Sequence, residues 1–177
     1  MVVSMTGYRP EKMPFREGDT AYLLFHDTLR EVMTELIGNG ATDFISGVAR
    51  GFDLWAAEEV LHLRNKNPNV KLQCAIPFLK QADSWDEKDK ERYKSVLSAA
   101  DRCVLISEKY RRDCFFARNR YMVDRADIVL CAFNGLGGGT AYTVKYALKS
   151  ERAVIQIDPS DCGITMLGRP LPNFHSI

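Results

Sequence analysis

The stretch CAFNGLGGGTAYTVKYAL, residues 131–148, combines three features that together indicate the fold. It starts in an apolar run, passes through a turn with three consecutive glycines, and ends in a segment typical of a helix. Glycine inside a regular element costs roughly 0.5–1 kcal/mol relative to alanine, so three in a row require a reason. The stretch therefore predicts a strand, a tight loop and a helix in succession.

The same alternation recurs along the chain. Short apolar runs rich in β-branched residues predict six strands, with helix-like stretches between them. The predicted strands are 2–6, 43–46, 70–76, 103–107, 127–132 and 153–157, and the predicted helices are 20–37, 54–65, 87–99, 117–125 and 141–149. Apolar strands that alternate with helices predict an α/β fold with three layers, in which helices cover both faces of a mostly parallel sheet.

Length and composition limit the classes of protein. A chain of 177 residues predicts a single domain over 1–177, and glycines and prolines after Asp158 predict an irregular tail over 158–177. The net charge of +1 gives no overall attraction to nucleic acid or to membranes. No apolar run approaches the roughly 20 residues of a membrane span.

The cysteines and the first residues predict a cytoplasmic protein. None of the five cysteines stands in a C-x-x-C pair, and no two histidines show metal-ligand spacing. We therefore expect free thiols and no metal site. The segment 1–13 has no basic region followed by an apolar one, so we expect no signal peptide.

Three glycine loops follow predicted strands, at the edge where parallel sheets bind their ligands. They are TGYRP at 6–10, SGVARGFD at 46–53 and GLGGGT at 135–140. A fourth segment, RNR at 118–120, starts the helix before the fifth strand. The candidate ligand-binding residues in these segments are Gly7, Arg9, Ser46, Gly47, Arg50, Gly51, Asp53, Arg118, Asn119, Arg120, Gly137, Gly138, Gly139 and Thr140.

The triple glycine predicts an anion site. Without a Cβ, the backbone approaches a ligand closely, and Thr140 is a suitable N-cap for the next helix. The free N–H groups at a helix start, together with the helix dipole, suit a phosphate. A Walker A loop would need a lysine, and a dinucleotide fingerprint would need a third glycine at position 140. The alternative is a tight turn that binds nothing.

The other candidates carry alternatives of their own. Asp53 suits an N-cap for the helix at 54, so its loop is expected to hold a ribose or base rather than the phosphate, and a purely capping role is equally open. The arginines match phosphate geometry, or lie on a solvated surface. Trp85 either stacks on a base or closes the edge of the core.

Together, SGVARGFD, RNR and GGGTAYT resemble the SLOG superfamily, which unites the DNA-processing protein A (Smf) family with the Lonely-Guy phosphoribohydrolases. The chain is most similar to its YpsA-like branch, through TGYRP, LWAAE, PFLKQADSW, RYKSVLSAAD and RNRYMVDRAD. The resemblance implies a Rossmann-like sheet with strand order 3-2-1-4-5-6. It also implies a nucleotide or nucleotide-derived ligand and a homodimer or higher homo-oligomer. No cofactor is required.

One departure bears on activity. The phosphoribohydrolases carry a glutamate in a G-T-x-x-E arrangement, and Thr143 stands at that position here. Threonine is a poor general acid or base at neutral pH. We therefore expect a nucleotide binder or sensor, with two alternatives left open. One is a hydrolase that uses another carboxylate, such as Asp53 or Glu58. The other is a single-stranded DNA-binding protein, which the neutral charge disfavours and the arginines of 111–125 keep open.

Overall fold

The computed structural model describes residues 1–171 and 174, and it has the α/β architecture that the sequence predicts. Its strands are β1 (Val2–Gly7), β2 (Asp43–Ser46), β3 (Lys71–Ile76), β4 (Arg102–Leu105), β5 (Ile128–Ala132), β6 (Ala153–Ile157) and β7 (Ile164–Gly168). Its helices are α1 (Thr20–Gly38), α2 (Phe52–Arg64), α3 (Glu87–Ala99), α4 (Cys114–Arg125) and α5 (Gly139–Lys149), with a 3₁₀ turn, η1, at Pro10–Lys12.

The strands form one sheet in the order β4-β3-β2-β1-β5-β6-β7. The expected order 3-2-1-4-5-6 is wrong for the fourth strand, which pairs with β3 at the outer edge rather than with β1. The chain steps outward from β1 to β4 through α1, α2 and α3, and α4 then returns it to the other side of β1. This reversal places β1 between β2 and β5, so the three glycine loops remain neighbours.

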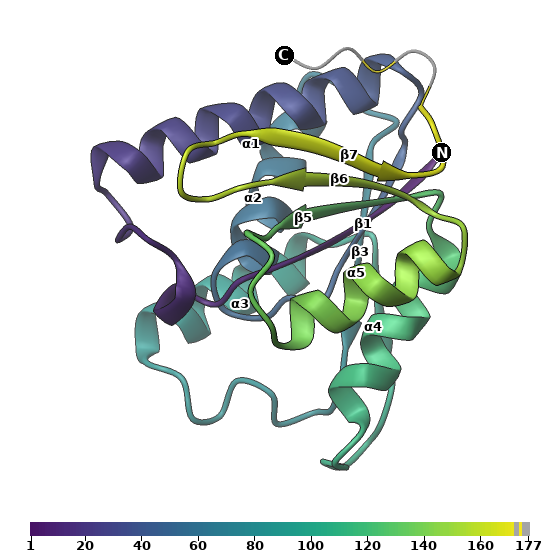
Figure 1. Ribbon diagram of the computed structural model, residues 1–177. Helices are drawn as coiled ribbons and strands as arrows, with labels where there is room; N and C mark the ends of the chain where they lie inside the picture. The colour runs from purple at the N-terminus through teal and green to yellow at the C-terminus, as the bar shows by residue number, and fades with distance from the viewer. Residues whose placement is uncertain (172–173, 175–177) are drawn as a thin grey trace.

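Helices cover both faces of the sheet. Helices α4 and α5 pack side by side on one face, while α1 contacts α2, and α2 contacts α3 (Figure 1). Helix α1 packs through an apolar face, on which Phe25, Leu29, Val32 and Leu36 recur at helical spacing and are almost fully buried. Strand β5 lies next to the central strand β1 and is buried along its whole length. The core therefore lies between the helices and the central strands.

The predicted irregular tail contains a strand. Residues Ile164–Gly168 form β7, which pairs antiparallel with β6 in the register Ile155↔Met166. The glycines and prolines that indicated irregular structure flank this strand rather than interrupt it. Gly168 ends it at a φ of 73°, and Pro170 follows. The remainder of the tail includes residues 172–173 and 175–177, which lie outside the described part of the chain.

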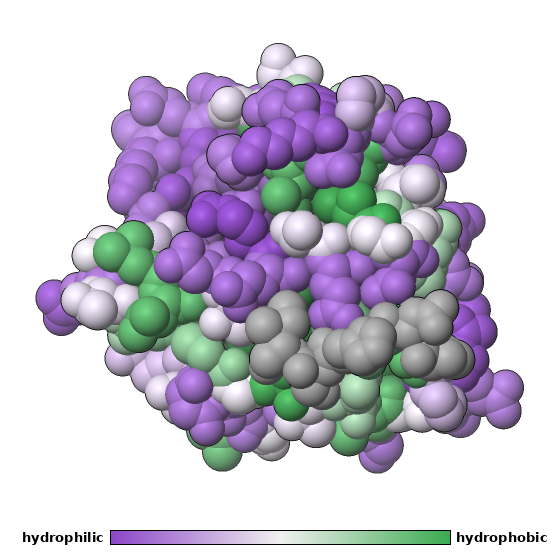
Figure 2. All heavy atoms as spheres, turned by 90° about the horizontal axis from the view of Figure 1, so that it is seen from above, coloured by the Kyte–Doolittle hydropathy of each residue, from purple (hydrophilic) through white to green (hydrophobic). Residues whose placement is uncertain are grey.

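Among the described residues, no helix is both long enough and apolar enough to cross a bilayer. The face seen in Figure 2 is largely hydrophilic, with apolar side chains in separate patches. Exposed large apolar residues include Leu79, Tyr110 and Phe116. The expected homo-oligomer remains a prediction.

Candidate functional site

A cavity of about 270 Å³ opens at the carboxyl ends of the central strands. Its wall comes from four places that are far apart in sequence: the end of β1 with η1, the loop after β2, the start of α4 and the start of α5. It lies where the strand order reverses between β1 and β5, the point at which open α/β sheets bind ligands. The cavity therefore joins segments that the sequence analysis selected one by one.

A buried ion pair lies in the wall of this cavity. Asp53 and Arg118 are 4% and 5% exposed, and a guanidinium nitrogen of Arg118 lies 3.7 Å from a carboxylate oxygen of Asp53. Burial raises the pKa of Asp53 to about 6, although Arg118 acts against that rise. Burial likewise lowers the pKa of Arg118, and Asp53 opposes this change. Each charge is thus held in a site that disfavours it, partly compensated by the other.

Backbone groups complete the surroundings of the pair. Arg118 donates hydrogen bonds to the carbonyl of Gly47 and, at 2.7 Å, to the side-chain oxygen of Asn119. A Cβ at position 47 would overlap the guanidinium of Arg118, which explains the glycine there. Ser46 donates a hydrogen bond to the carbonyl of Asp53 and accepts one from the N–H of Val48. Ser46 and Gly47 therefore position the ion pair and do not line the cavity.

The structure corrects the expected capping role of Asp53. Helix α2 begins at Phe52, and its N-cap is Gly51 at a φ of 82°. Asp53 lies inside the first turn, where its carboxylate accepts a hydrogen bond from the N–H of Gly7 at 3.2 Å and another from the N–H of Ala49. Its side chain thus connects the loops after β1 and β2 instead of capping its own helix.

Helix α5 begins two residues earlier than it would if Thr140 were its N-cap. Its first residue is Gly139, and Gly138 takes the N-cap position at a φ of 130°, which an L-residue rarely adopts. Among the described residues no side chain caps this helix start. Gly138, Gly139 and the buried Thr140 all line the cavity, whereas Gly137 is exposed and does not. The start of α5 therefore lies at the cavity, and its first N–H groups have no partner from a side-chain cap.

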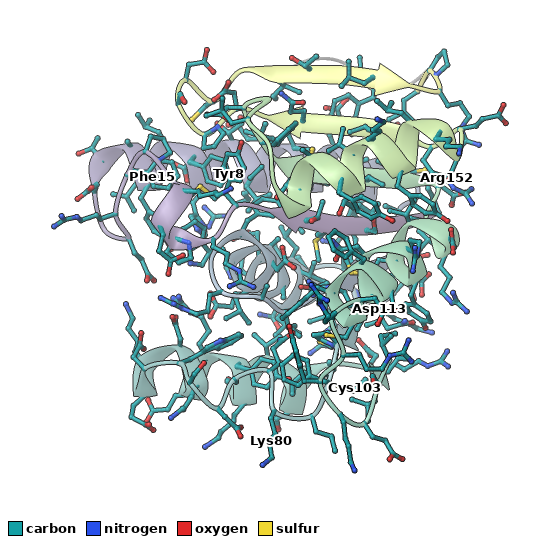
Figure 3. All side chains as sticks on the ribbon, turned by 60° about the horizontal axis from the view of Figure 1, so that its bottom comes forward. Tyr8, Phe15, Lys80, Cys103, Asp113 and Arg152 are labelled. Carbon is teal, nitrogen blue, oxygen red and sulfur yellow. The ribbon has the colours of Figure 1, made fainter. Side chains whose placement is uncertain are left out.

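Six residues of this wall were missed by the sequence analysis, and two of them, Lys12 and Tyr8, bond to the glycine loop. Lys12 of η1 lines the cavity, and its ammonium donates a hydrogen bond to the carbonyl of Gly137 at 3.2 Å. Tyr8, seen after β1 in Figure 3, bonds through its hydroxyl to Asn134 at 2.5 Å and to the carbonyl of Leu136 at 3.1 Å. The glycine loop is thus attached to the loop after β1. A lysine just beyond TGYRP was the available signal.

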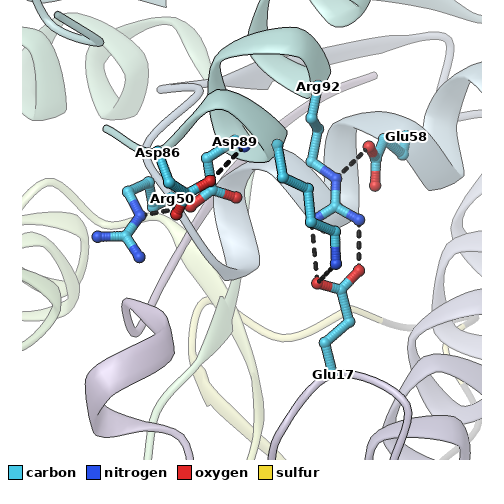
Figure 4. Close-up of polar contacts among 7 residues, drawn as sticks. Glu17, Arg50, Glu58, Asp86, Asp89 and Arg92 are labelled. Carbon is cyan, nitrogen blue, oxygen red and sulfur yellow. Dashed lines mark hydrogen bonds and ion pairs between the residues drawn. The ribbon is translucent and has the colours of Figure 1, made fainter. Parts of the chain in front are cut away.

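Arg50 is placed outside the cavity. Its guanidinium pairs with Asp89 at 2.5 Å and with Glu11 at 2.9 Å, so it faces the start of α3 (Figure 4). A neighbouring cluster in the same view joins Arg92 to Glu17 and, at 2.6 Å, to Glu58. Of the arginines expected at the ligand, the cavity therefore receives Arg118 and Arg9 but not Arg50.

The remaining candidates divide in the same way. Arg9 is exposed at the cavity rim, with its guanidinium 5.8 Å from the centre of the Phe115 ring. Asn119 lines the cavity and donates to the hydroxyl of Thr143 at 2.8 Å. Arg120 points away and bonds to Tyr142 at 3.4 Å, and Trp85 packs edge-on against Tyr93. Within the described residues no three His, Cys, Asp or Glu side chains gather into a metal site.

Comparison with known proteins identifies the family. A family model described as the YspA SLOG family (YpsA) matches residues 3–161. The chain belongs to this family. A UPF0398 protein of Bacillus licheniformis is 29% identical over 154 residues, which cover 85% of this chain and 84% of that protein. One from Bacillus thuringiensis is 30% identical over 152 residues, with coverages of 84% and 83%. The resemblance to the YpsA-like branch of SLOG proteins is confirmed.

Solved structures share the fold of this SLOG chain. DNA processing protein A from Helicobacter pylori, whose single-stranded DNA binding mode was studied, superposes with a TM-score of 0.61 at 20% identity. The match covers 91% of this chain and 70% of that one. DNA processing protein A from Streptococcus pneumoniae superposes with a TM-score of 0.58 at 18% identity. The match covers 96% of this chain and 52% of the S. pneumoniae chain. At such identities the likeness establishes the fold alone.

Proposed function

We propose that the cavity binds a phosphate group of a nucleotide or nucleotide-derived ligand, and that the protein acts as a binder or sensor. The observation that carries this proposal is the convergence of Arg9, Lys12 and Arg118 with the uncapped start of α5 on one cavity. Cations and free helix N–H groups are the two features that favour an anion. The carboxylate of Asp53 is engaged by Arg118 and by backbone N–H groups, and that of Glu11 by Arg50.

The surroundings of Thr143 support binding rather than hydrolysis. Its hydroxyl accepts a hydrogen bond from Asn119 and donates one to the carbonyl of Gly139 at 2.9 Å, so it holds α4 to α5. A hydroxyl occupied in this way has no base to activate it. We expect slow or absent cleavage of nucleoside 5′-monophosphates into base and ribose phosphate. Product analysis that finds turnover near 1 s⁻¹, within the usual enzyme range, would contradict this expectation.

Binding itself is tested by a thermal-shift screen of nucleotides and their derivatives. A ligand at about 100 times its dissociation constant stabilises the folded state by roughly 2.7 kcal/mol. For a chain of this size, that corresponds to a rise in Tm on the order of 5–10 °C. Inorganic phosphate and the matching unphosphorylated nucleoside are the comparison ligands. A nucleoside that binds as tightly as its phosphorylated form would show that the cavity does not recognise phosphate.

A substitution at Gly139 tests whether the ligand binds in this cavity. A Cβ at Gly139 meets no atom within 4 Å, so we expect Gly139→Val to fold and to add side-chain atoms to the wall of the cavity. Gly137→Val is the matched control, because position 137 is equally open but lies outside the cavity. We expect the thermal shift to vanish in Gly139→Val and to persist in Gly137→Val. Equal affinity in both variants would mean that the ligand lies elsewhere.

A second candidate function, single-stranded nucleic acid binding, has one observation in its favour. Aromatic rings continue outward from the cavity: Phe115 on its wall contacts Phe78, which contacts Tyr110, 62% exposed. Rows of aromatic side chains beside cations suit unpaired bases. The H. pylori protein of the same fold binds single-stranded DNA, which agrees with this reading.

An oligonucleotide titration separates the two candidates. Under the nucleic acid alternative, a labelled single strand should bind with an affinity that falls steeply with salt, and Tyr110→Ala should weaken it. Under the primary proposal, a mononucleotide binds as well as the oligonucleotide does, and Tyr110→Ala changes neither affinity.

A further inference from the structure

Two cysteines lie side by side on neighbouring strands, away from the proposed ligand cavity. Cys74 of β3 and Cys103 of β4 are direct partners in the parallel register of these strands. Because register partners point to the same face of a sheet, both side chains face α3. Contacts on that face agree: the thiol of Cys103 donates to the carbonyl of Leu97 in α3 at 3.7 Å, and Cys74 belongs to the core cluster that includes Tyr93 of α3.

The separation of these strands suits a disulfide. Neighbouring strands lie about 4.7–4.9 Å apart, within the range of about 4.4–6.8 Å between the Cα atoms of disulfide-linked cysteines. The proximity of Cys74 lowers the pKa of Cys103 against the larger effect of burial. Tyr93 lies against the pair as well: burial raises its pKa to about 12, and both thiols add to that rise. The two cysteines are therefore direct neighbours in the reduced protein.

The pair combines one accessible thiol with one protected thiol. Cys103 is exposed because β4 is the outermost strand of the sheet, and it is labelled in Figure 3. Cys74 is fully buried beneath it. Cys131 lacks this arrangement: it is buried on β5, and its register partners are Thr6 and Gln156. An oxidant can reach Cys103 first, and Cys74 is the thiol next to it.

We propose that Cys74 and Cys103 are a modification site, at which a hydroperoxide converts the two thiols into an intramolecular disulfide. The sulfur of Cys103 attacks one peroxide oxygen, forming an S–O bond while the O–O bond breaks. The leaving oxygen takes the thiol proton, which gives a sulfenic acid and water or an alcohol. The sulfur of Cys74 then attacks that of Cys103. The S–S bond forms, the S–O bond breaks, and hydroxide leaves as water with the proton of Cys74. The two sulfurs together lose two electrons, and the peroxide gains them.

Burial raises the pKa of both thiols, so the reaction proceeds slowly, with most of the Cys103 in the thiol form at neutral pH. Its product connects β3 to the edge strand β4. The site thus responds to sustained oxidation rather than to a brief pulse.

The experiment treats the reduced full chain with hydrogen peroxide, blocks remaining thiols in acid denaturant, and maps tryptic peptides without reduction. Trypsin cleaves after Lys71 and Lys80 and after Arg102 and Lys109, which isolates the two cysteines on peptides 72–80 and 103–109. We expect these two peptides to be joined, with the loss of two of the five thiols. Oxidation that leaves the two peptides unjoined, or that joins Cys103 to a second chain, overturns the proposal.

Single-thiol variants separate the two steps. In Cys74→Ser, Cys103 should stop at the sulfenic acid, which dimedone traps. In Cys103→Ser, the buried Cys74 should remain a thiol. Cys162→Ser is the matched control, because it removes another partly accessible cysteine and should leave the joined peptides unchanged. If Cys74 oxidises equally well in Cys103→Ser, access does not pass through Cys103 and the proposed order of steps is wrong.

Discussion

Arg118 and Arg50 were both expected at the ligand, both lie beside an aspartate, and the structure places them in opposite environments. The side chains of Arg118 and Asp53 are each 6% exposed, whereas those of Arg50 and Asp89 are 29% and 13% exposed. The first pair lies in the wall of the cavity, and the second connects the loop after β2 to the start of α3. A buried charge must keep its partner, because water cannot replace it, while a partly exposed charge is solvated when its partner is lost.

The largest effect is expected from Arg118→Ala. Removing the guanidinium leaves Asp53 buried beside an empty space, and breaking a buried ion pair costs about 3–5 kcal/mol. Urea unfolding at neutral pH measures that loss. Arg120→Ala is the control two residues away on the same helix, where an exposed side chain should change stability by no more than about 0.5 kcal/mol. Equal losses in the two variants would mean that burial of the pair has no special cost.

The charge on Asp53 should make stability depend on pH. Its pKa rises from the ordinary 3.8 to about 6, so the folded protein binds this proton more tightly than the unfolded chain. The stability from the neutral acid is full below about pH 4 and is lost as the pH rises through 6. At 1.36 kcal/mol for each pKa unit, the change is roughly 3 kcal/mol.

Asp53→Asn isolates this contribution. The difference in unfolding free energy between the variant and the parent should change between pH 4 and 7, and by more than it does for Asp83→Asn, the control at an exposed position. A flat difference for Asp53→Asn would show that the carboxylate keeps the same pKa in the folded and unfolded states.

The contrast between the two arginines also shows how far the structure could be predicted from the sequence. The strand–helix alternation predicted the α/β class, because burial on both faces makes the strands uniformly apolar. The same pattern did not fix the place of β4, since its partner depends on the direction of one crossover. Glycine loops marked the edge of the sheet at which the cavity opens, because the carboxyl ends of parallel strands meet there.

The direction of each side chain was beyond local sequence. SGVARGFD and RNR offered similar arginines, and the turn at Gly51 and the acidic start of α3 directed Arg50 outward. Asp53 looked like a cap because its spacing from the helix suited one. It became a buried partner only because α4 brings Arg118 beneath the loops of β1 and β2. Lys12 was missed for the same reason, since η1 folds it against a glycine loop 125 residues away.

Lys12→Gln sharpens the comparison at the ligand itself. Lys12 is exposed, and its ammonium donates a hydrogen bond to the carbonyl of Gly137, so we expect little change in stability. A charge-assisted hydrogen bond to phosphate contributes about 1.5–3 kcal/mol, which corresponds to a loss of about 10- to 150-fold in affinity for the best nucleotide in the screen. Calorimetric titration measures it, with Lys149→Gln at the far end of α5 as the control. An unchanged affinity would remove Lys12 from the proposed site.

The smallest effect is expected from Arg50→Ala. Its partners Asp89 and Glu11 keep access to water, and an ion pair of this kind contributes about 0–1 kcal/mol, less at high salt. Urea unfolding at low and high salt should therefore show a small loss that shrinks as salt is added, and nucleotide affinity should stay at the parent value because Arg50 does not line the cavity. Glu11→Gln, which removes one of the two carboxylate partners, is the companion variant. If Arg50→Ala instead abolishes binding while the protein stays folded, Arg50 must leave Asp89 and turn to the ligand. The two arginines would then differ in their position relative to the cavity only when no ligand is bound.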